Sequence, residues 1–136
     1  MTERDRLALV AGGGGFIGGW LVASLLAEGH RVRSVDNKAA ADWYQVSGDA
    51  ENLVLDLREL DACRKAVHGV DWVFDLACDM GGMGFIETNK VECMVSVLIG
   101  THMLLAASSA DVERFFFSSS ACVYRADKRT SRRSRR

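Results

Sequence analysis

The chain has 136 residues, of which 49% are apolar and 26% are charged, and it contains no proline. This length and balance predict one globular domain with a single core. The most apolar stretch, Val91–Ala107, is interrupted by Glu92, Ser96 and Gly100, so we expect no membrane-spanning segment. The charged residues at the start lead directly into an apolar run, which argues against a signal peptide and favours a cytoplasmic protein.

Charge is distributed unevenly, because seven of the 17 basic residues and one of the 18 acidic residues lie in the last 12 positions, 125–136. The tail therefore carries about +6 and the body about −7. We expect a domain over residues 1–124 and a disordered tail over 125–136, because the tail has no apolar periodicity. The tail could bind RNA or another polyanion, but nucleic acid is the less favoured partner because no aromatic residue lies among the arginines.

Strand-like and helix-like runs alternate along the body. Repeated βα units with apolar strands predict an α/β fold, a Rossmann-type doubly wound parallel sheet of order 3-2-1-4-5, covered by helices on both faces. The predicted strands are Arg6–Ala11, Arg31–Val35, Leu53–Leu55, Trp72–Ala77 and Arg114–Ser118. The predicted helices are Phe16–Glu28, with Gly29 as its cap, Leu57–Val67, and a long helix over Glu87–Ser109.

A glycine-rich turn separates the first strand from the first helix. Gly12, Gly15 and Gly18 have the spacing of a dinucleotide-binding turn, with Phe16 and Ile17 between the last two. In such a turn the first glycine makes the bend, the second lets a pyrophosphate approach the positive helix end, and the third lets helix and strand pack closely. These residues are predicted to contact the cofactor.

Two acids follow the second and third predicted strands. Asp36 can accept hydrogen bonds from the adenosine ribose and would repel the extra phosphate of NADP, so NAD is the predicted cofactor. Asp56 is predicted to lie near the adenine together with Leu57, or to cap a helix that begins at Leu57. These two roles for Asp56 are compatible.

Two further segments carry a family resemblance. The run Asp79-Met80-Gly81-Gly82-Met83-Gly84-Phe85-Ile86 and the run Ser118-Ser119-Ser120-Ala121-Cys122-Val123-Tyr124 resemble segments of the GDP-mannose 3,5-epimerases, members of the extended short-chain dehydrogenase/reductase group. The glycines of the first run also suggest a loop whose backbone approaches a ligand closely.

The resemblance implies an NAD-dependent epimerase that oxidises C4 of GDP-mannose, exchanges protons at C3 and C5, and reduces C4 again. It implies that Ser120 and Cys122 are catalytic and that Gly81 and Ala121 contact the substrate beside them. Leu76 and Ala77, at the end of the fourth strand, are implied to face the nicotinamide ribose. No metal site is indicated, since Cys63, Cys78, Cys93 and Cys122 lie far apart, with no CxxC pair.

The resemblance extends over residues 6–124 and omits the substrate-binding half. Tyr124 and Lys128 match the Tyr-x-x-x-Lys spacing of this enzyme group only by coincidence, because the group's pair lies on a helix further downstream. The alternatives are therefore a non-catalytic NAD-binding fragment or regulatory module, and a 4-epimerase or 4,6-dehydratase of another nucleotide sugar. The long helix over 87–109 could pair two subunits in a homodimer, or its apolar stripe could be covered by the chain's own sheet.

Overall fold

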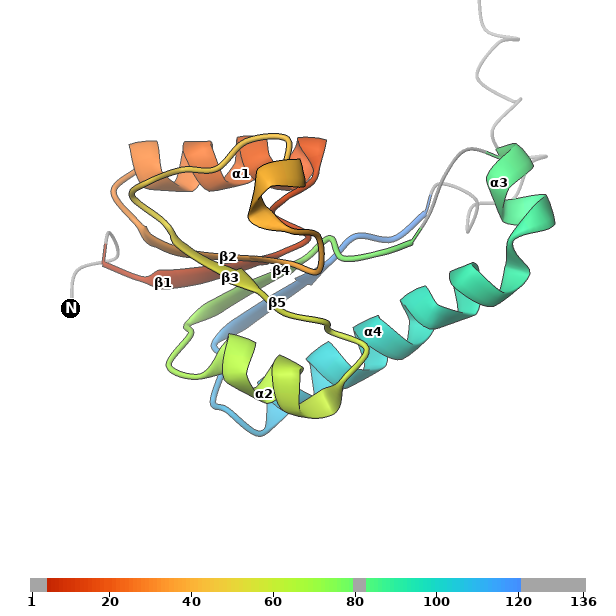
Figure 1. Ribbon diagram of the computed structural model, residues 1–136. Helices are drawn as coiled ribbons and strands as arrows, with labels where there is room; N and C mark the ends of the chain where they lie inside the picture. The colour runs from red at the N-terminus through yellow and green to blue at the C-terminus, as the bar shows by residue number, and fades with distance from the viewer. Residues whose placement is uncertain (1–4, 80–82, 121–136) are drawn as a thin grey trace, which may run out of the picture.

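Five parallel strands form one sheet in the computed structural model, which describes residues 5–79 and 83–120 (Figure 1). In spatial order they are β3 (Glu51–Val54), β2 (Arg31–Asp36), β1 (Leu7–Ala11), β4 (Trp72–Asp75) and β5 (Arg114–Phe117). This confirms the predicted order 3-2-1-4-5. Because Ala11 is in register with Val35 on one side and Asp75 on the other, three strands end together at one edge of the sheet.

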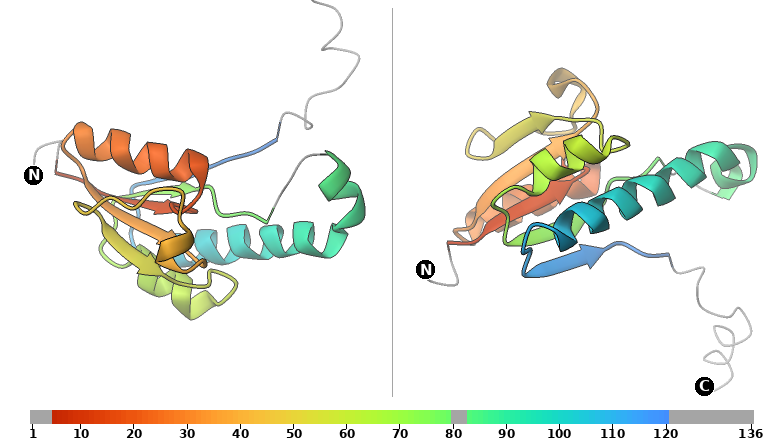
Figure 2. Two further views of the ribbon diagram at one scale, coloured as in Figure 1. Left: turned by 45° about the horizontal axis from the view of Figure 1, so that its top comes forward. Right: turned by 90° about the horizontal axis from the view of Figure 1, so that it is seen from below.

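Helices lie on both faces of the sheet. Helix α1 (Phe16–Ala27) lies over β1 and β2 on one face, and α2 (Leu60–Val67) and α4 (Lys90–Ser108) lie on the other (Figures 1 and 2). Alternate residues of β1 serve the two cores, as expected for a strand buried on both sides. Leu9 packs on the α2–α4 side, and Val10 packs on the α1 side.

Several predicted boundaries differ from the structure: β3 begins at Glu51 and not at Leu53, and β4 ends at Asp75 and not at Ala77. The second helix begins at Leu60 and not at Leu57, because residues 57–59 form a turn. The long helix predicted over Glu87–Ser109 is present as α4 from Lys90 to Ser108, but its first two residues belong to a separate helix, α3 (Met83–Thr88). Asn89 separates the two helices, since its φ of −121° and ψ of 55° are not helical. The loop predicted over residues 79–86 is therefore helical from Met83 onward. Gly84 lies within α3 with open space where a Cβ would be, and it needs no unusual backbone conformation.

The amino-terminal half of α4 projects past the carboxyl edge of the sheet, with α3 at its tip (Figure 2). Its buried residues, Met103, Ala106 and Ala107, all lie in the carboxyl-terminal half. By length and composition α4 is apolar enough to cross a membrane, contrary to the sequence prediction. Along the chain, α4 connects β4 to β5, and its carboxyl-terminal half packs in the core. This packing accounts for part of its apolar character.

The prediction that helices cover both faces of the sheet is correct for only part of the sheet. In the described residues the core beneath α1 reaches Trp72 and Phe74 of β4, but no helix lies over β5 on the α1 side. Phe116 of β5 is 52% exposed on that side. The predicted basic tail, 125–136, lies outside the described residues.

Candidate dinucleotide-binding site

The turn from β1 to α1 is built from glycines that no other residue could replace without movement. Gly12 has a φ of +83°, and a Cβ there would lie 2.9 Å from the Leu76 carbonyl oxygen. The Gly12 N–H donates to the Val35 carbonyl at 2.8 Å, which fixes the turn against β2. A Cβ on Gly18 would overlap the Gly12 carbonyl oxygen. The packing role predicted for Gly18 is thus present in the structure.

Helix α1 begins without a side-chain cap. Its N-cap residue is Gly15, which has no side chain to accept a hydrogen bond, and its first turn contains no acid. The backbone N–H groups of a first turn have no partner within the helix and carry the positive end of its dipole. This end of α1 is therefore suited to bind an anionic group such as a pyrophosphate.

Asp36 ends β2 directly beside this turn. Its carboxylate oxygens accept hydrogen bonds from the backbone N–H of Gly14 at 3.1 Å and from that of Lys38 at 3.2 Å. The Lys38 ammonium donates to the Gly14 carbonyl at 3.2 Å. Asp36 is thus nearly buried and held in one orientation, with the lysine crossing the glycine turn next to it.

Asp56 follows β3 and forms an ion pair with Arg58. The Arg58 guanidinium donates to both carboxylate oxygens, each 2.9 Å from Nε, and the Arg58 backbone N–H donates to Oδ1 at 3.0 Å. These bonds from Arg58 hold the pKa of Asp56 below its usual value. The helix-capping role predicted for Asp56 is wrong, because α2 begins at Leu60 with Glu59 as its N-cap.

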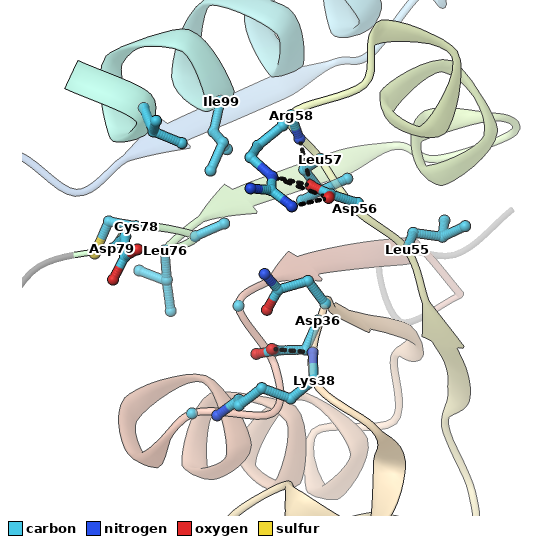
Figure 3. Close-up of a pocket in the computed structure, with 15 residues that line it drawn as sticks. Asp36, Lys38, Leu55, Asp56, Leu57, Arg58, Leu76, Cys78, Asp79 and Ile99 are labelled. Carbon is cyan, nitrogen blue, oxygen red and sulfur yellow. Dashed lines mark hydrogen bonds and ion pairs between the residues drawn. The ribbon is translucent and has the colours of Figure 1, made fainter. Parts of the chain in front are cut away.

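These elements enclose a pocket of about 380 Å³ at the carboxyl edge of the sheet (Figure 3). Asp36 and Lys38 stand on one wall, with Asp56 and Arg58 on the opposite wall. Seven of the predicted cofactor residues line it: Gly12, Gly15, Asp36, Asp56, Leu57, Leu76 and Ala77.

The other predicted residues lie elsewhere. Gly18 packs behind the turn, and Phe16 and Ile17 are 59% and 70% exposed on α1, outside the pocket lining. Ser120 is exposed in the segment after β5. The predicted substrate and catalytic residues Gly81, Ala121 and Cys122 lie outside the described residues.

Two basic residues of the pocket were not predicted as site residues. Lys38 and Arg58 each stand two positions after an acid that follows a strand, in Asp36-Asn37-Lys38 and in Asp56-Leu57-Arg58. This repeated acid-x-base spacing is the sequence signal that could have predicted both basic residues. In the structure the Arg58 side chain folds back onto Asp56, and the Lys38 side chain folds back onto the Gly14 carbonyl. Both cations therefore face the same pocket.

Cys63 and Cys78 are not activated thiols. Cys63 is buried, donates to the Leu57 carbonyl at 3.2 Å, and has its pKa raised to about 11 by burial and by Asp75. Burial and nearby carboxylates also raise the pKa of Cys78, at the pocket wall. Cys93, on α4, is half-buried. No group of three or more metal-ligating side chains gathers in residues 5–79 and 83–120.

The residues fit a dinucleotide. The left-handed Gly12 leaves no room for a side chain in the turn, the uncapped end of α1 suits the pyrophosphate, and Asp36 lies where a ribose would follow. Ligands of open α/β sheets bind at this edge, where the strand order reverses between β1 and β4.

A family model describing the NAD dependent epimerase/dehydratase family matches residues 8–135. The chain belongs to this family. Among curated proteins, GDP-mannose 3,5-epimerase 1 of Oryza sativa subsp. japonica is 42% identical over 130 residues, which cover 90% of this chain and 32% of that protein. GDP-mannose 3,5-epimerase of Arabidopsis thaliana is 39% identical over 122 residues, covering 85% of this chain and 31% of that protein.

Solved structures of epimerases share the fold. An epimerase from Methanothermobacter thermautotrophicus aligns with a TM-score of 0.77 and 26% identity over 90% of this chain and 38% of that chain. The UDP-glucose 4-epimerase of Thermus thermophilus, solved in complex with NAD, aligns with a TM-score of 0.73 and 28% identity over 84% of this chain and 37% of that chain. The chain spans about a third of the length of the curated epimerases it matches.

Proposed function

We propose that this chain is the NAD-binding part of a nucleotide-sugar epimerase of the GDP-mannose 3,5 type, and that alone it binds NAD weakly without turnover. The observation that carries the proposal is the pocket in which Asp36 lies beside the uncapped end of α1 and opposite Asp56. The identity to two plant GDP-mannose 3,5-epimerases supports the substrate class.

Asp36 supports NAD over NADP. Its carboxylate is fixed by two backbone N–H groups and keeps further lone pairs for ribose hydroxyls. A phosphate on that ribose would meet a buried negative charge. Lys38 weakens this repulsion only in part, because its ammonium is already bonded to the Gly14 carbonyl. Arg33 lies away from the pocket, where it pairs with Glu51.

Bound NAD would supply a hydride acceptor for a sugar hydroxyl, and this chain would supply the surface that orients it. The glycine turn and α1 would hold the pyrophosphate, and Asp36 would hold the adenosine ribose. The resemblance assigns proton exchange to Cys122 and orientation of the sugar to Ser120. A thiolate is suited to removing a proton acidified by a neighbouring ketone.

The test is calorimetry with NAD and NADP, followed by incubation with GDP-mannose in deuterated water. We expect weak NAD binding, still weaker NADP binding, and no deuterium at C3 or C5 of the sugar.

Asp36→Asn should weaken NAD binding about tenfold and reduce the preference for NAD, since about 1.4 kcal/mol corresponds to that factor. Asp42→Asn, an exposed acid in the short helix η1 (Ala40–Asp42), is the matched control. Absence of NAD binding would refute the proposal, and deuterium incorporation would refute the inactivity of the isolated chain.

We also propose a homodimer through α4. The outer stripe of α4 comprises Val91, Met94, Val97, Leu98, Leu104 and Leu105, which are 42–73% exposed. These residues recur at helical spacing along one side and alternate with few polar groups, which is typical of a helix-pairing surface.

Light scattering after size exclusion tests this pairing. We expect a concentration-dependent dimer that Leu105→Asp converts to a monomer, because the aspartate would place a charge within an apolar contact. Phe116→Asp, at a residue of matched exposure on another face, should leave the dimer intact. A monomer at all concentrations, or a dimer indifferent to Leu105→Asp, would exclude the α4 contact.

A further inference from the structure

Asp75 carries a buried carboxylate to which the site described above gives no role. It ends β4, its side chain is 3% exposed, and neither carboxylate oxygen makes a hydrogen bond of good geometry. A Cβ built on Gly100 of α4 would lie 3.7 Å from Asp75 Oδ2, so the carboxylate lies between the sheet and α4. Among the ion pairs of the described residues none includes Asp75. Its charge, when ionised, is therefore uncompensated.

The Asp75 carboxylate lies behind one wall of the dinucleotide pocket. The three residues that follow it, Leu76, Ala77 and Cys78, line the pocket, and so does Ile99, the neighbour of Gly100 on α4. Leu76, Cys78 and Ile99 gather on one side of the pocket (Figure 3). A charge buried beneath this wall is screened much less than the charge of an exposed acid, so its field reaches into the pocket.

The proposed binding mode brings the nicotinamide half of the cofactor to this wall. Asp36, after β2, would hold the adenosine ribose, and the uncapped end of α1, after β1, would hold the pyrophosphate. A dinucleotide lies across the crevice where the strand order reverses, so the half beyond the pyrophosphate has to extend over the end of β4. At this step the inference rests on the proposed function.

The oxidised and reduced forms of the cofactor differ in charge at the nicotinamide ring. The ring of NAD⁺ carries one positive charge, which is neutralised when the ring accepts a hydride (one proton and two electrons) from a sugar carbon whose hydroxyl releases its proton. The adenosine, the ribose groups and the pyrophosphate are the same in NAD⁺ and NADH. A negative charge behind the β4 wall therefore attracts the NAD⁺ ring and has no such attraction for the neutral ring of NADH.

We propose that the Asp75 carboxylate shifts the binding preference of this chain toward NAD⁺ and away from NADH, and that protonation of Asp75 removes this shift. Burial, opposed only in part by the Ala77 backbone N–H, raises the pKa of Asp75 to about 6, so the carboxylate changes charge between pH 5 and pH 8. Tighter binding of the oxidised form lowers the reduction potential of the bound cofactor. The ionised Asp75 thus favours return of the hydride to the sugar, the second redox step of the proposed epimerase.

Two thiols interact with the Asp75 charge, and neither ionises in this pH range. Cys63 of α2 and Cys78 after β4 both have a raised pKa, so both stay neutral below pH 8. Gly100 of α4 and Phe117 of β5, which also face Asp75, carry no charge. The other charged or titratable groups on the adjoining segments are Asp56, Arg58, Asp79 and His102.

The experiment measures the dissociation constant of NADH from its fluorescence, and that of NAD⁺ from its displacement of NADH, at pH 8 and pH 5. The ratio of the two constants isolates the ring charge, because the other contacts are common to both ligands. At pH 8, Asp75→Asn should lower the preference for NAD⁺ about tenfold. In the original chain the preference should be about fivefold larger at pH 8 than at pH 5, because NAD⁺ itself favours the ionised carboxylate and keeps part of the preference at pH 5.

Asp61→Asn is the matched control, because Asp61 is 84% exposed on α2, and it should change neither the ratio nor its pH dependence. A ratio that is the same at both pH values in the original chain would overturn the inference without any substitution. A pH dependence that persists in Asp75→Asn would also overturn it, and would assign the effect to another group such as His102. In both cases the two ligands still bind and the proposed function stands, whereas absence of binding of either ligand would refute the proposed function and this inference with it.

Discussion

Replacing Gly18 by alanine is expected to destabilise the chain by about 3 kcal/mol or more and to abolish NAD binding. The added Cβ would overlap the Gly12 carbonyl oxygen and would lie 2.8 Å from the Gly12 carbonyl carbon and 2.9 Å from the Gly13 Cα. All three are backbone atoms of the β1–α1 turn, so no side chain can rotate away to make room. Helix α1 would have to move off the turn, and its amino-terminal end would leave the pocket.

Urea unfolding followed by circular dichroism measures this effect, with the midpoint and slope compared between variants. Gly48→Ala is the matched control, because Gly48 has an ordinary φ and open space around its Cβ position. It should change the free energy of unfolding by no more than about 0.5 kcal/mol, and could raise it slightly through the unfolded state. A Gly18→Ala variant as stable as the control would show that the turn relaxes easily.

The second large effect is expected at Asp75, a buried acid at the end of β4. The side chain is on the α2–α4 face and 3% exposed, and neither carboxylate oxygen makes a hydrogen bond of good geometry, although the Ala77 backbone N–H lies close enough to lower the pKa of Asp75 against the effect of burial. Burial raises its pKa from 3.8 to about 6. A buried carboxylate without partners is costly because the charged form loses its hydration.

The sign of the pH dependence follows from this raised pKa. The folded chain binds the Asp75 proton more tightly than the unfolded chain, so this group favours folding most at low pH. Its contribution is lost as the pH rises through the unfolded pKa and then the folded pKa near 6. Above pH 7 the full penalty applies, about 3 kcal/mol for a shift from 3.8 to about 6.

Asp75→Asn should therefore raise the free energy of unfolding at pH 8. At pH 5 this gain in the free energy of unfolding over the original chain should be smaller by about 1.4 kcal/mol. Urea unfolding at both pH values measures this difference. Asp61→Asn, at an acid that is 84% exposed on α2, should show no comparable change between the two pH values. An Asp75→Asn variant whose advantage is independent of pH would contradict the titration of this group in the folded chain.

The sequence predicted the fold because its signals are local. Apolar strand runs, helical spacing and the Gly12, Gly15 and Gly18 turn each depend on neighbouring residues, and together they determine the parallel order 3-2-1-4-5. Asp36 could be placed in the site for the same reason, because an acid at the end of β2 must lie at the carboxyl edge of the sheet.

Other features depend on contacts between distant segments. The sequence pattern gave no reason to break the long helix at Asn89, since apolar residues continue on both sides of it. The helix-capping prediction for Asp56 failed because α2 begins at Leu60, beyond the reach of Asp56, and Glu59 is its N-cap. The need for a glycine at position 14, where an added Cβ would lie 2.7 Å from Trp43 and 2.9 Å from Asp36, appears only when the loop after β2 folds over the turn.

The sequence by itself determined the family, the sheet order and the position of a dinucleotide turn, since these follow from residue spacing and the handedness of βα units. Only the tertiary structure decided that Lys38 and Arg58 face one pocket, that Asp75 is buried away from any side-chain partner, and that the α1 side of β5 is open. Burial and the pairing of charges depend on which distant segments meet, and an uncovered face is recognised only once the segments that are present have been placed.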